Sequence, residues 1–218
     1  VGDQSCKTCH AKENNQLLQS HHYMAMQPPN DSTVAGNFNN TSFTADGVTS
    51  RFFKKDGKYF INTQGDDGKN HDYEVKYTFG FTPLQQYLVE FPGGKMQVPR
   101  VSWDVNQKKW FNQYAGQKIP SHDWLHWTGN AQNWNTMCAS CHSTNLKKNY
   151  DVATDTYKTT YNSINVSCES CHGPGKQHIN FINEDYKSGK RSRGSYLKMG
   201  KNFSQNEQLN TCAPCHAR

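Results

Sequence analysis

Between residues 41 and 115, apolar and polar side chains alternate with a period of two, the side-chain period of a β-strand. The segment "HDYEVKYTF" (71–79) shows this alternation most clearly. The stretch "SRFFKKDGKYFINTQ" (50–64) contains two such runs around the turn Lys55-Asp56-Gly57-Lys58, which is typical of a hairpin. Further runs are "QYLVEF" and "KMQVPRVSWD", which flank Pro92-Gly93-Gly94, and then "KKWFNQY". The pattern predicts an antiparallel β insertion over 41–115.

The pattern on either side of this region is different. Residues 5–22 are expected to form a helix that carries Leu17 and Leu18 on one face, and the Pro/Asn/Thr-rich residues 27–40 are expected to form a loop. From residue 120 onward we expect helical segments and loops. The predicted fold class is therefore α+β, with one domain formed by 1–40 and 116–218 and the β insertion placed within it.

The composition is too polar for an ordinary protein core. The 218 residues suit one large domain or two small ones, but only 33% are hydrophobic and the mean hydropathy is −0.96. Some other apolar material is needed to complete the core.

The cysteines point to that material. The pattern Cys-x-x-Cys-His occurs four times: CKTCH at 6–10 (motif 1), CASCH at 138–142 (motif 2), CESCH at 168–172 (motif 3) and CAPCH at 212–216 (motif 4). This is the attachment pattern of c-type haem. On a helical turn its three side chains share one face, so two thioether bonds and one imidazole can meet the same porphyrin. The motifs contain all eight cysteines of the chain and supply four proximal iron ligands: Cys6, Cys9, Cys138, Cys141, Cys168, Cys171, Cys212 and Cys215, with His10, His142, His172 and His216.

Other uses of the cysteines fit the pattern less well. Two zinc sites of four cysteines each would not require a histidine after every pair, and Cys-x-x-Cys disulfides are more often redox-active than structural. Four haem c groups explain every cysteine and would provide the missing apolar core. Their eight propionates would also offset the apoprotein charge of +6, so the charge gives no reason to expect nucleic-acid binding. The basic run at 187–201 is typical of a solvated loop, with a partner-docking patch as the alternative.

The remaining histidines are candidates for the distal iron ligands. Histidine occurs ten times, so six remain for four distal positions, which favours bis-histidine ligation for most haems. The ranking from sequence context places His22, His126 and His178 first, with His71, His122 and His21 in reserve. Five methionines, which are more often core residues, are the alternative axial ligands: Met24, Met26, Met96, Met137 and Met199.

His178 is expected to ligate a haem other than the one held by motif 3. Only six residues separate it from His172, a fully extended span of about 20 Å, and Gly173-Pro174-Gly175 predicts a compact turn that shortens the reach. His22 is expected to serve a haem other than that of His10, because a helix would place it about 18 Å away.

Several stretches resemble a known family of multihaem cytochromes, related to the tetrahaem electron acceptor of hydroxylamine oxidoreductase. A closer resemblance is to larger exported multihaem proteins whose cytochrome module precedes tetratricopeptide-type repeats. The stretches are "SHHYMAM" (20–26), "YTFGFTPLQQYLVEFPGGKMQ" (77–97), "LHWTGNAQNWNTMCASCHSTNL" (125–146), "INVSCESCHGPGKQH" (164–178) and "CAPCHAR" (212–218). The resemblance implies electron transfer and matches His22, His126 and His178 to ligand histidines. The β insertion is larger than in the small helical members, and the larger relatives continue beyond the last motif.

Three functions remain open from the sequence. The first is an electron-transfer protein with mostly bis-histidine haems and protein redox partners. The second is an oxidoreductase with one open haem that acts on a small nitrogen or sulfur species, and the third is a self-associating subunit of an extracellular filament. No transmembrane stretch or signal peptide is evident. Because haem c is attached outside the cytoplasm, we expect an exported protein of the periplasm or cell exterior whose signal has been removed.

Overall fold

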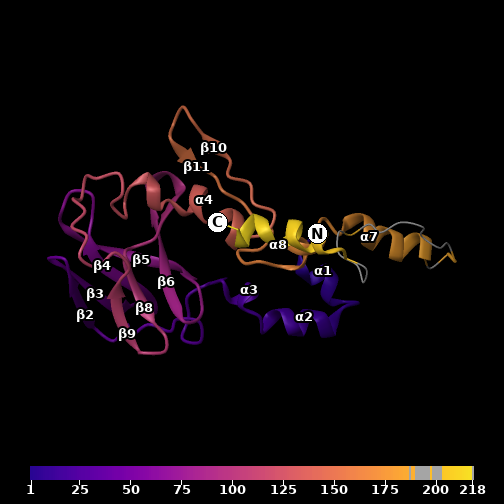
Figure 1. Cartoon of the computed structure of the whole chain (residues 1–218), viewed down its shortest axis with the longest axis horizontal. Coiled ribbons are helices and arrows are strands. Elements are labelled where there is room, and N and C mark those ends of the chain that lie inside the picture. Colours follow the sequence, from indigo (N-terminus) through magenta and orange to yellow (C-terminus); the bar gives the residue numbers. More distant parts are fainter. Residues whose placement is uncertain (187, 190–196, 198–202, 218) are drawn as a thin grey trace. The chain divides into compact units, whose positions relative to one another are not determined.

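The polypeptide folds into helices and a largely antiparallel sheet, which confirms the mixed helix-and-strand class. The structure is a computed structural model that describes residues 1–186, 188–189, 197 and 203–217 (Figure 1). Most of the basic run at 187–201 lies outside these residues, so its expected role stays a prediction. Two compact units are present. The motif unit comprises Val1–Tyr23, Ser140–Leu146 and Tyr161–Arg218, and the sheet unit comprises Met24–Ala139 and Lys147–Thr160.

The sheet unit is built on nine strands, and its main path follows the order β2-β3-β4-β5-β6-β8-β9, with β7 paired to β6 and β1 to β5. The strands are β1 (Met26–Gln27), β2 (Thr41–Ala45), β3 (Val48–Lys55), β4 (Lys58–Gln64), β5 (Asn70–Phe79), β6 (Leu84–Phe91), β7 (Lys95–Gln97), β8 (Val101–Asp104) and β9 (Lys109–Asn112). The turn between β3 and β4 is Asp56-Gly57, and both residues have positive φ, as a two-residue hairpin turn requires. The first and last strands of the path also meet, since the Asn112 side chain donates to Asp46 at 2.7 Å.

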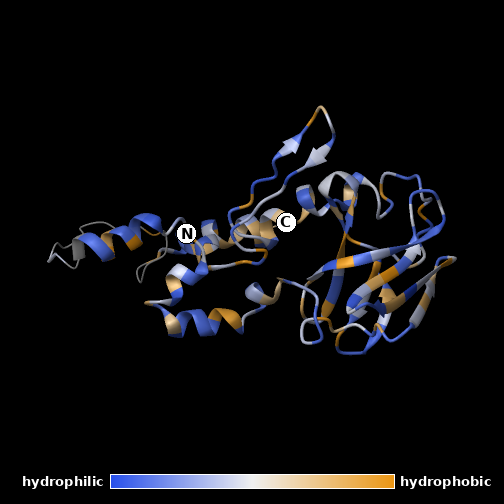
Figure 2. Ribbon diagram, turned by 180° about the vertical axis from the view of Figure 1, so that it is seen from behind, coloured by the Kyte–Doolittle hydropathy of each residue, from blue (hydrophilic) through white to orange (hydrophobic). Residues whose placement is uncertain are grey.

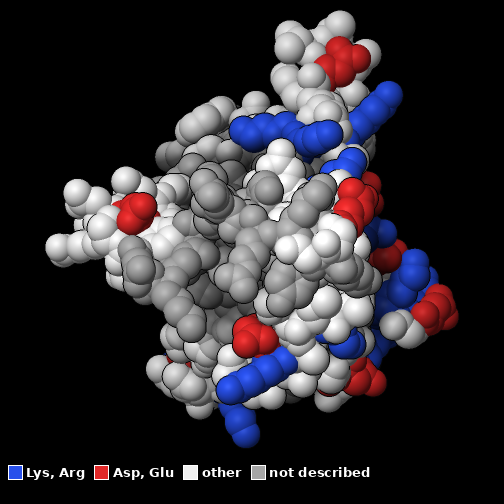
Figure 3. Space-filling view, turned by 90° about the vertical axis from the view of Figure 1, so that its right-hand side faces the viewer, with Lys and Arg blue, Asp and Glu red and all other residues white. Residues whose placement is uncertain are grey.

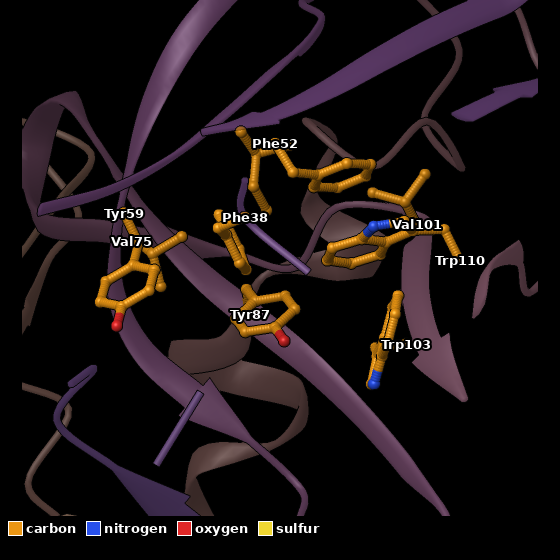
Figure 4. Packing of buried hydrophobic residues seen from close by; sticks show 9 residues of the cluster. Phe38, Phe52, Tyr59, Val75, Tyr87, Val101, Trp103 and Trp110 are labelled. Carbon is orange, nitrogen blue, oxygen red and sulfur yellow. The ribbon is translucent and has the colours of Figure 1, made fainter. Parts of the chain in front are cut away.

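Alternation along these strands buries one face, as the period of two predicts. In β4, for example, Tyr59, Ile61 and Thr63 are buried and the residues between them are not. Hydrophobic residues recur along the strands in Figure 2. They meet in a core rich in aromatic rings (Figure 4), formed by Phe38, Phe52, Tyr59, Ile61, Val75, Tyr87, Val101, Trp103 and Trp110. The rings of Phe52 and Trp110 stack with centroids 3.5 Å apart.

The sheet unit extends beyond the strands on both sides of the predicted 41–115 insertion. The segment before β2 belongs to it because Phe38 enters the aromatic core and the Gln85 side chain bonds to Ala35 and Thr33. The segment after β9 belongs to it because Gln97 donates to the carbonyls of Trp127 and Gly129. This second segment contains η2 (Asn130–Gln132) and α4 (Trp134–Met137).

A small hairpin that the sequence did not indicate also belongs to the sheet unit. It consists of β10 (Tyr150–Asp151) and β11 (Thr156–Tyr157), and it approaches η1 (Pro92–Gly94). A Cβ atom at Gly94 would lie 2.2 Å from the carbonyl oxygen of Tyr157, so the contact requires glycine there. The prediction of only helices and loops after residue 120 was wrong at this hairpin, because strands of two residues have no detectable alternation.

The motif unit consists of short helices. The predicted single helix over 5–22 is wrong, because three helices occupy the region: α1 (Asp3–Lys7), α2 (Ala11–Leu18) and α3 (His21–Met24). The first break falls at His10, whose φ of −115° and ψ of 48° are not helical. The second falls at Ser20, whose hydroxyl donates to Leu17 and accepts from the Tyr23 N–H. The later helices are α5 (Ala139–His142), α6 (Cys168–His172), α7 (Lys176–Asn180), the π-helix η3 (Phe181–Tyr186) and α8 (Gln205–His216).

Charges of both signs are present on the face that Figure 3 shows. On the face in Figure 3, the basic and acidic side chains do not gather into a patch of one sign. No helix within the described part of the chain is long and apolar enough to cross a bilayer.

Candidate haem-attachment centre

Each of the four motifs lies on or beside a short helix. Motif 3 is α6 itself, motif 4 forms the last turn of α8, and motif 1 begins in α1. Motif 2 begins at Cys138 and continues through α5. A helical turn brings the second cysteine and the histidine onto the face of the first, which is the arrangement that attachment to one porphyrin needs. None of the eight cysteines forms a disulfide.

The motifs adjoin one another in an order that differs from the sequence. Cys6 of motif 1 forms a side-chain hydrogen bond with Cys168 of motif 3. Cys171 of motif 3 lies near Cys212 of motif 4, whose charge adds to burial in raising the pKa of the Cys171 thiol. The Cys141 thiol of motif 2 contacts the carbonyl oxygen of Pro214 in motif 4 at 3.8 Å. The motifs therefore follow one another in space as 1, 3, 4 and 2.

Burial raises the pKa of three of the thiols, those of Cys6, Cys168 and Cys171. The pKa of the Cys168 thiol is raised to about 12. Burial is the largest cause, and the charges of Asp3 and Cys6 add to it. Zinc coordination and disulfide exchange need a thiolate, and sites for them normally lower the pKa of the cysteine. The environment of Cys168 is therefore not that of a thiol activated for disulfide exchange.

His178 lies beside the histidine of motif 1. It is on α7, and its ring centroid is 6.3 Å from that of His10, with 34° between the ring planes. His178 therefore lies beside a histidine of motif 1, although motif 3, which contains His172, is much closer to it in the sequence.

His22 makes a second pair, with the histidine of motif 4. The ring centroids of His22 and His216 are 6.0 Å apart, and the ring planes are nearly perpendicular, at 83°. His22 is on α3 and His216 ends α8. Each pair combines one proximal histidine with one of the three distal candidates that ranked first.

These separations are suited to one iron between two imidazoles. Imidazole nitrogens bind transition metals at about 2.0–2.1 Å, so the centres of two rings on opposite sides of one metal lie about 6 Å apart. The angle between the planes does not limit this arrangement, because each ring can rotate about the shared axis. The residues present therefore fit two bis-histidine haems, one held by motif 1 and one by motif 4.

The third leading candidate, His126, lies in the sheet unit. Its ring is buried, and its Nδ1 is 2.8 Å from the Thr128 hydroxyl, which leaves Nε2 as the nitrogen for a metal. Burial is the main reason that the pKa of His126 is lowered, and the positive charge of Arg100 lowers it further. The ring is therefore neutral near pH 7, as a ligand must be. His126 also lines a cavity of about 260 Å³ together with Arg100, Lys118 and Trp127.

The reserve candidates occupy exposed positions. His71 is on β5 and bonds to the Asp67 carboxylate at 2.9 Å, His122 is in the loop before His126, and His21 begins α3. Among the methionines, Met26 is fully buried in the sheet unit and Met137 is 53% exposed, while Met199 lies outside the described residues.

The described part of the motif unit has a polar interior. Every large apolar side chain in the buried core of the described chain belongs to the sheet unit. The buried side chains of the motif unit are Asn14, Ser143, Thr144, Asn165, Ser167 and Glu169. Four porphyrins would provide the apolar surface that this unit lacks, in agreement with the low hydropathy of the sequence.

Glu169 is a residue of this centre that the sequence reasoning missed. It is the only acidic residue inside any of the four motifs, and that signal was available in the sequence. Its side chain is 3% exposed and accepts hydrogen bonds from several segments of the motif unit.

Comparisons with known proteins agree with a cytochrome. The model of the family described as "Cytochrome c554 and c-prime" matches residues 105–173, which include His126 and motifs 2 and 3. The structure is similar to the solved structure titled "Crystal Structure of Outer Cell Wall Cytochrome OcwA", with a TM-score of 0.57 and 19% identity. The alignment covers 99% of this chain and 37% of the longer one. No curated protein matches the sequence. The family match supports a multihaem c-type cytochrome, and the solved structure shows a shared fold.

Proposed function

We propose that this chain is an exported tetrahaem c-type cytochrome that carries electrons between redox partner proteins through mostly bis-histidine haems. The observation that carries the proposal is the pairing of His10 with His178 and of His22 with His216, at ring separations of 6.3 and 6.0 Å. Haem c supplies an iron that gains and loses one electron.

The paired histidines favour electron transfer over chemistry on a substrate. At the haems of motifs 1 and 4, His10 with His178 and His22 with His216 would each supply two ligands to one iron, which would leave no open position there for a small nitrogen or sulfur species. The ligands also need not move when the iron changes its oxidation state. Each pair joins two distant parts of the chain, and this fixes the spacing between neighbouring centres.

The order of the motifs suggests the order of the redox centres. Contacts join motif 1 to motif 3, motif 3 to motif 4, and motif 4 to motif 2. An electron that enters at one end of this series would leave at the other after passing two intermediate centres. Partner proteins would then dock near motif 1 or motif 2.

The proposal is tested first by haem content and spin state. The intact mass of the denatured holoprotein should equal the polypeptide plus four haems, and EPR of the oxidised protein at low temperature should show mainly low-spin iron. Fewer haems with free thiols would contradict the tetrahaem assignment. A dominant high-spin signal would contradict bis-histidine ligation and favour an enzyme with an open haem.

Two adjacent histidines offer a matched pair of variants. His22→Ala should convert one haem from low to high spin, because it removes the partner of His216. His21→Ala removes the neighbouring imidazole on the same helix and should leave the spectrum unchanged. The reverse result would show that the ligand assignment at motif 4 is wrong.

A further inference from the structure

The carboxylate of Glu169 lies at the meeting point of four segments of the motif unit. Oε1 accepts from the Gly175 N–H at 2.8 Å, and Oε2 accepts from the Gly2 N–H at 3.1 Å. Oε2 also accepts from the side-chain amides of Asn145 at 3.0 Å and Asn162 at 3.3 Å. The α-amino nitrogen of Val1 donates to both oxygens, at 3.0 and 3.1 Å.

Two of these bonds join the segments that carry the first histidine pair. Gly2 directly precedes α1, which leads into His10, and Gly175 directly precedes α7, which carries His178. Glu169 itself is in motif 3, so one side chain holds both segments against α6. The two oxygens of one carboxyl group therefore bridge Gly2 and Gly175.

Every partner of Glu169 is a hydrogen-bond donor. A carboxylate suits this environment because both of its oxygens accept. Glutamine has nearly the same size, but its amide nitrogen would face donors whichever way the side chain turned. A buried donor that loses its acceptor is costly, so an amide here would release at least one of the two backbone segments.

We propose that Glu169 is a positioning residue that holds His178 opposite His10, and so keeps the haem of motif 1 six-coordinate. The inference rests on the proposed bis-histidine pairing and assigns a specific role to a residue that binds no iron itself. Among the four motifs, only motif 3 has an acidic residue that can do this.

The test compares variants of the full holoprotein by EPR and by hydrogen exchange. Glu169→Gln should retain four haems by mass and convert about one haem in four to high spin, as His178→Ala should. Added imidazole should restore the low-spin signal in both variants, because the distal position is open and the haem remains attached. Peptides that cover 173–180 should also exchange faster in Glu169→Gln than in the parent protein.

Two controls separate this role from general effects. Asn162→Ala removes a donor to the same carboxylate but leaves the bonds to Gly2 and Gly175, so it should stay low-spin. Glu184→Gln neutralises an exposed carboxylate on η3, six residues after His178, and should also stay low-spin. The double variant Glu169→Gln/His178→Ala should show no more high-spin haem than His178→Ala alone, because both changes open the same position.

The outcomes distinguish the inference from the function on which it rests. If His178→Ala leaves all haems low-spin, the proposed ligation is wrong. If His178→Ala produces high-spin haem but Glu169→Gln does not, the ligation stands and the role of Glu169 is overturned. If Glu169→Gln does not accumulate, Glu169→Asp takes its place. The aspartate side chain is shorter by one bond of about 1.5 Å, so its carboxylate cannot reach both backbone segments. Partial conversion of the haem to high spin is therefore expected, and the absence of any conversion would contradict the role of Glu169.

Discussion

Replacing Asn135 with alanine should destabilise the sheet unit by about 2–5 kcal/mol. Asn135 is 1% exposed, and it accepts from the Met96 N–H at 2.8 Å and donates to the Gly94 carbonyl at 3.1 Å. Alanine removes the side-chain partner of both part-buried backbone groups, and each group left without a partner costs about 1–3 kcal/mol. The third contact, from Asn135 Nδ2 to the Thr159 hydroxyl at 2.9 Å, adds less, because that hydroxyl also bonds to the Lys148 carbonyl.

The measurement is guanidinium unfolding of the holoprotein, followed by far-UV circular dichroism. Asn130→Ala, on the nearby helix η2, changes an exposed asparagine and should alter the free energy of unfolding by no more than about 0.5 kcal/mol. Asn135→Asp keeps an acceptor for Met96 but sets an oxygen against the Gly94 carbonyl, so it should be at least as destabilising as alanine. The reasoning is refuted if Asn135→Ala and Asn130→Ala unfold at the same midpoint.

Three further predictions concern the core, the haems and pH. Phe52→Ala, at the fully buried ring stacked on Trp110, should cost the sheet unit about 3–5 kcal/mol by chemical denaturation while the haem count stays at four. The apoprotein with its cysteines changed to serine should keep its β-sheet circular dichroism and lose its helical signal, and full retention of both would contradict the need for haem in the motif unit. Burial raises the pKa of Glu169, but the hydrogen bonds from Gly175, the Val1 amino group and Gly2 outweigh it and hold this pKa at about 2, below the ordinary 4.5. This shift should therefore contribute about 3 kcal/mol to the free energy of unfolding above pH 4.5, and the contribution should be lost as the pH falls toward 2. In an acid titration, Glu169→Gln should not show this loss of stability.

The strands were predictable because their signal is local. Alternation over 71–79 and the dipeptide Asp56-Gly57 together fix a strand and a turn without reference to the rest of the chain. The helix breaks at His10 and Ser20 were not predictable in this way. The helix-forming residues around them favour one continuous helix, and the backbone departs from it because of contacts that periodicity does not report.

The residues of the candidate centre also fall into two groups, those that local spacing predicts and those that depend on tertiary packing. The attachment cysteines and proximal histidines are predicted from a spacing of a few residues, a signal that the sequence alone contains. A limit on chain reach argues against His172 as the partner of His178, but it could not predict that His178 lies beside His10, because that depends on how α1 and α7 pack in three dimensions. Glu169 was missed because the sequence was searched for groups that bind iron, and this carboxylate binds backbone.

The two units differ in the side chains that they bury. The sheet unit gathers the buried aromatic side chains of the described chain and can close its own core. The motif unit buries polar side chains, and these organise the backbone: Thr144 bonds to the Asn165 carbonyl, the Ser167 N–H and the Ser170 hydroxyl, as Glu169 does to its own partners. Hydrogen bonds of this kind fix geometry but contribute little net stability, and the apolar surface of the proposed haems would provide most of it. In the proposed holoprotein, polar contacts would hold the ligands while the cofactors supplied the stability, so one carboxylate could control the coordination of a haem that it does not touch.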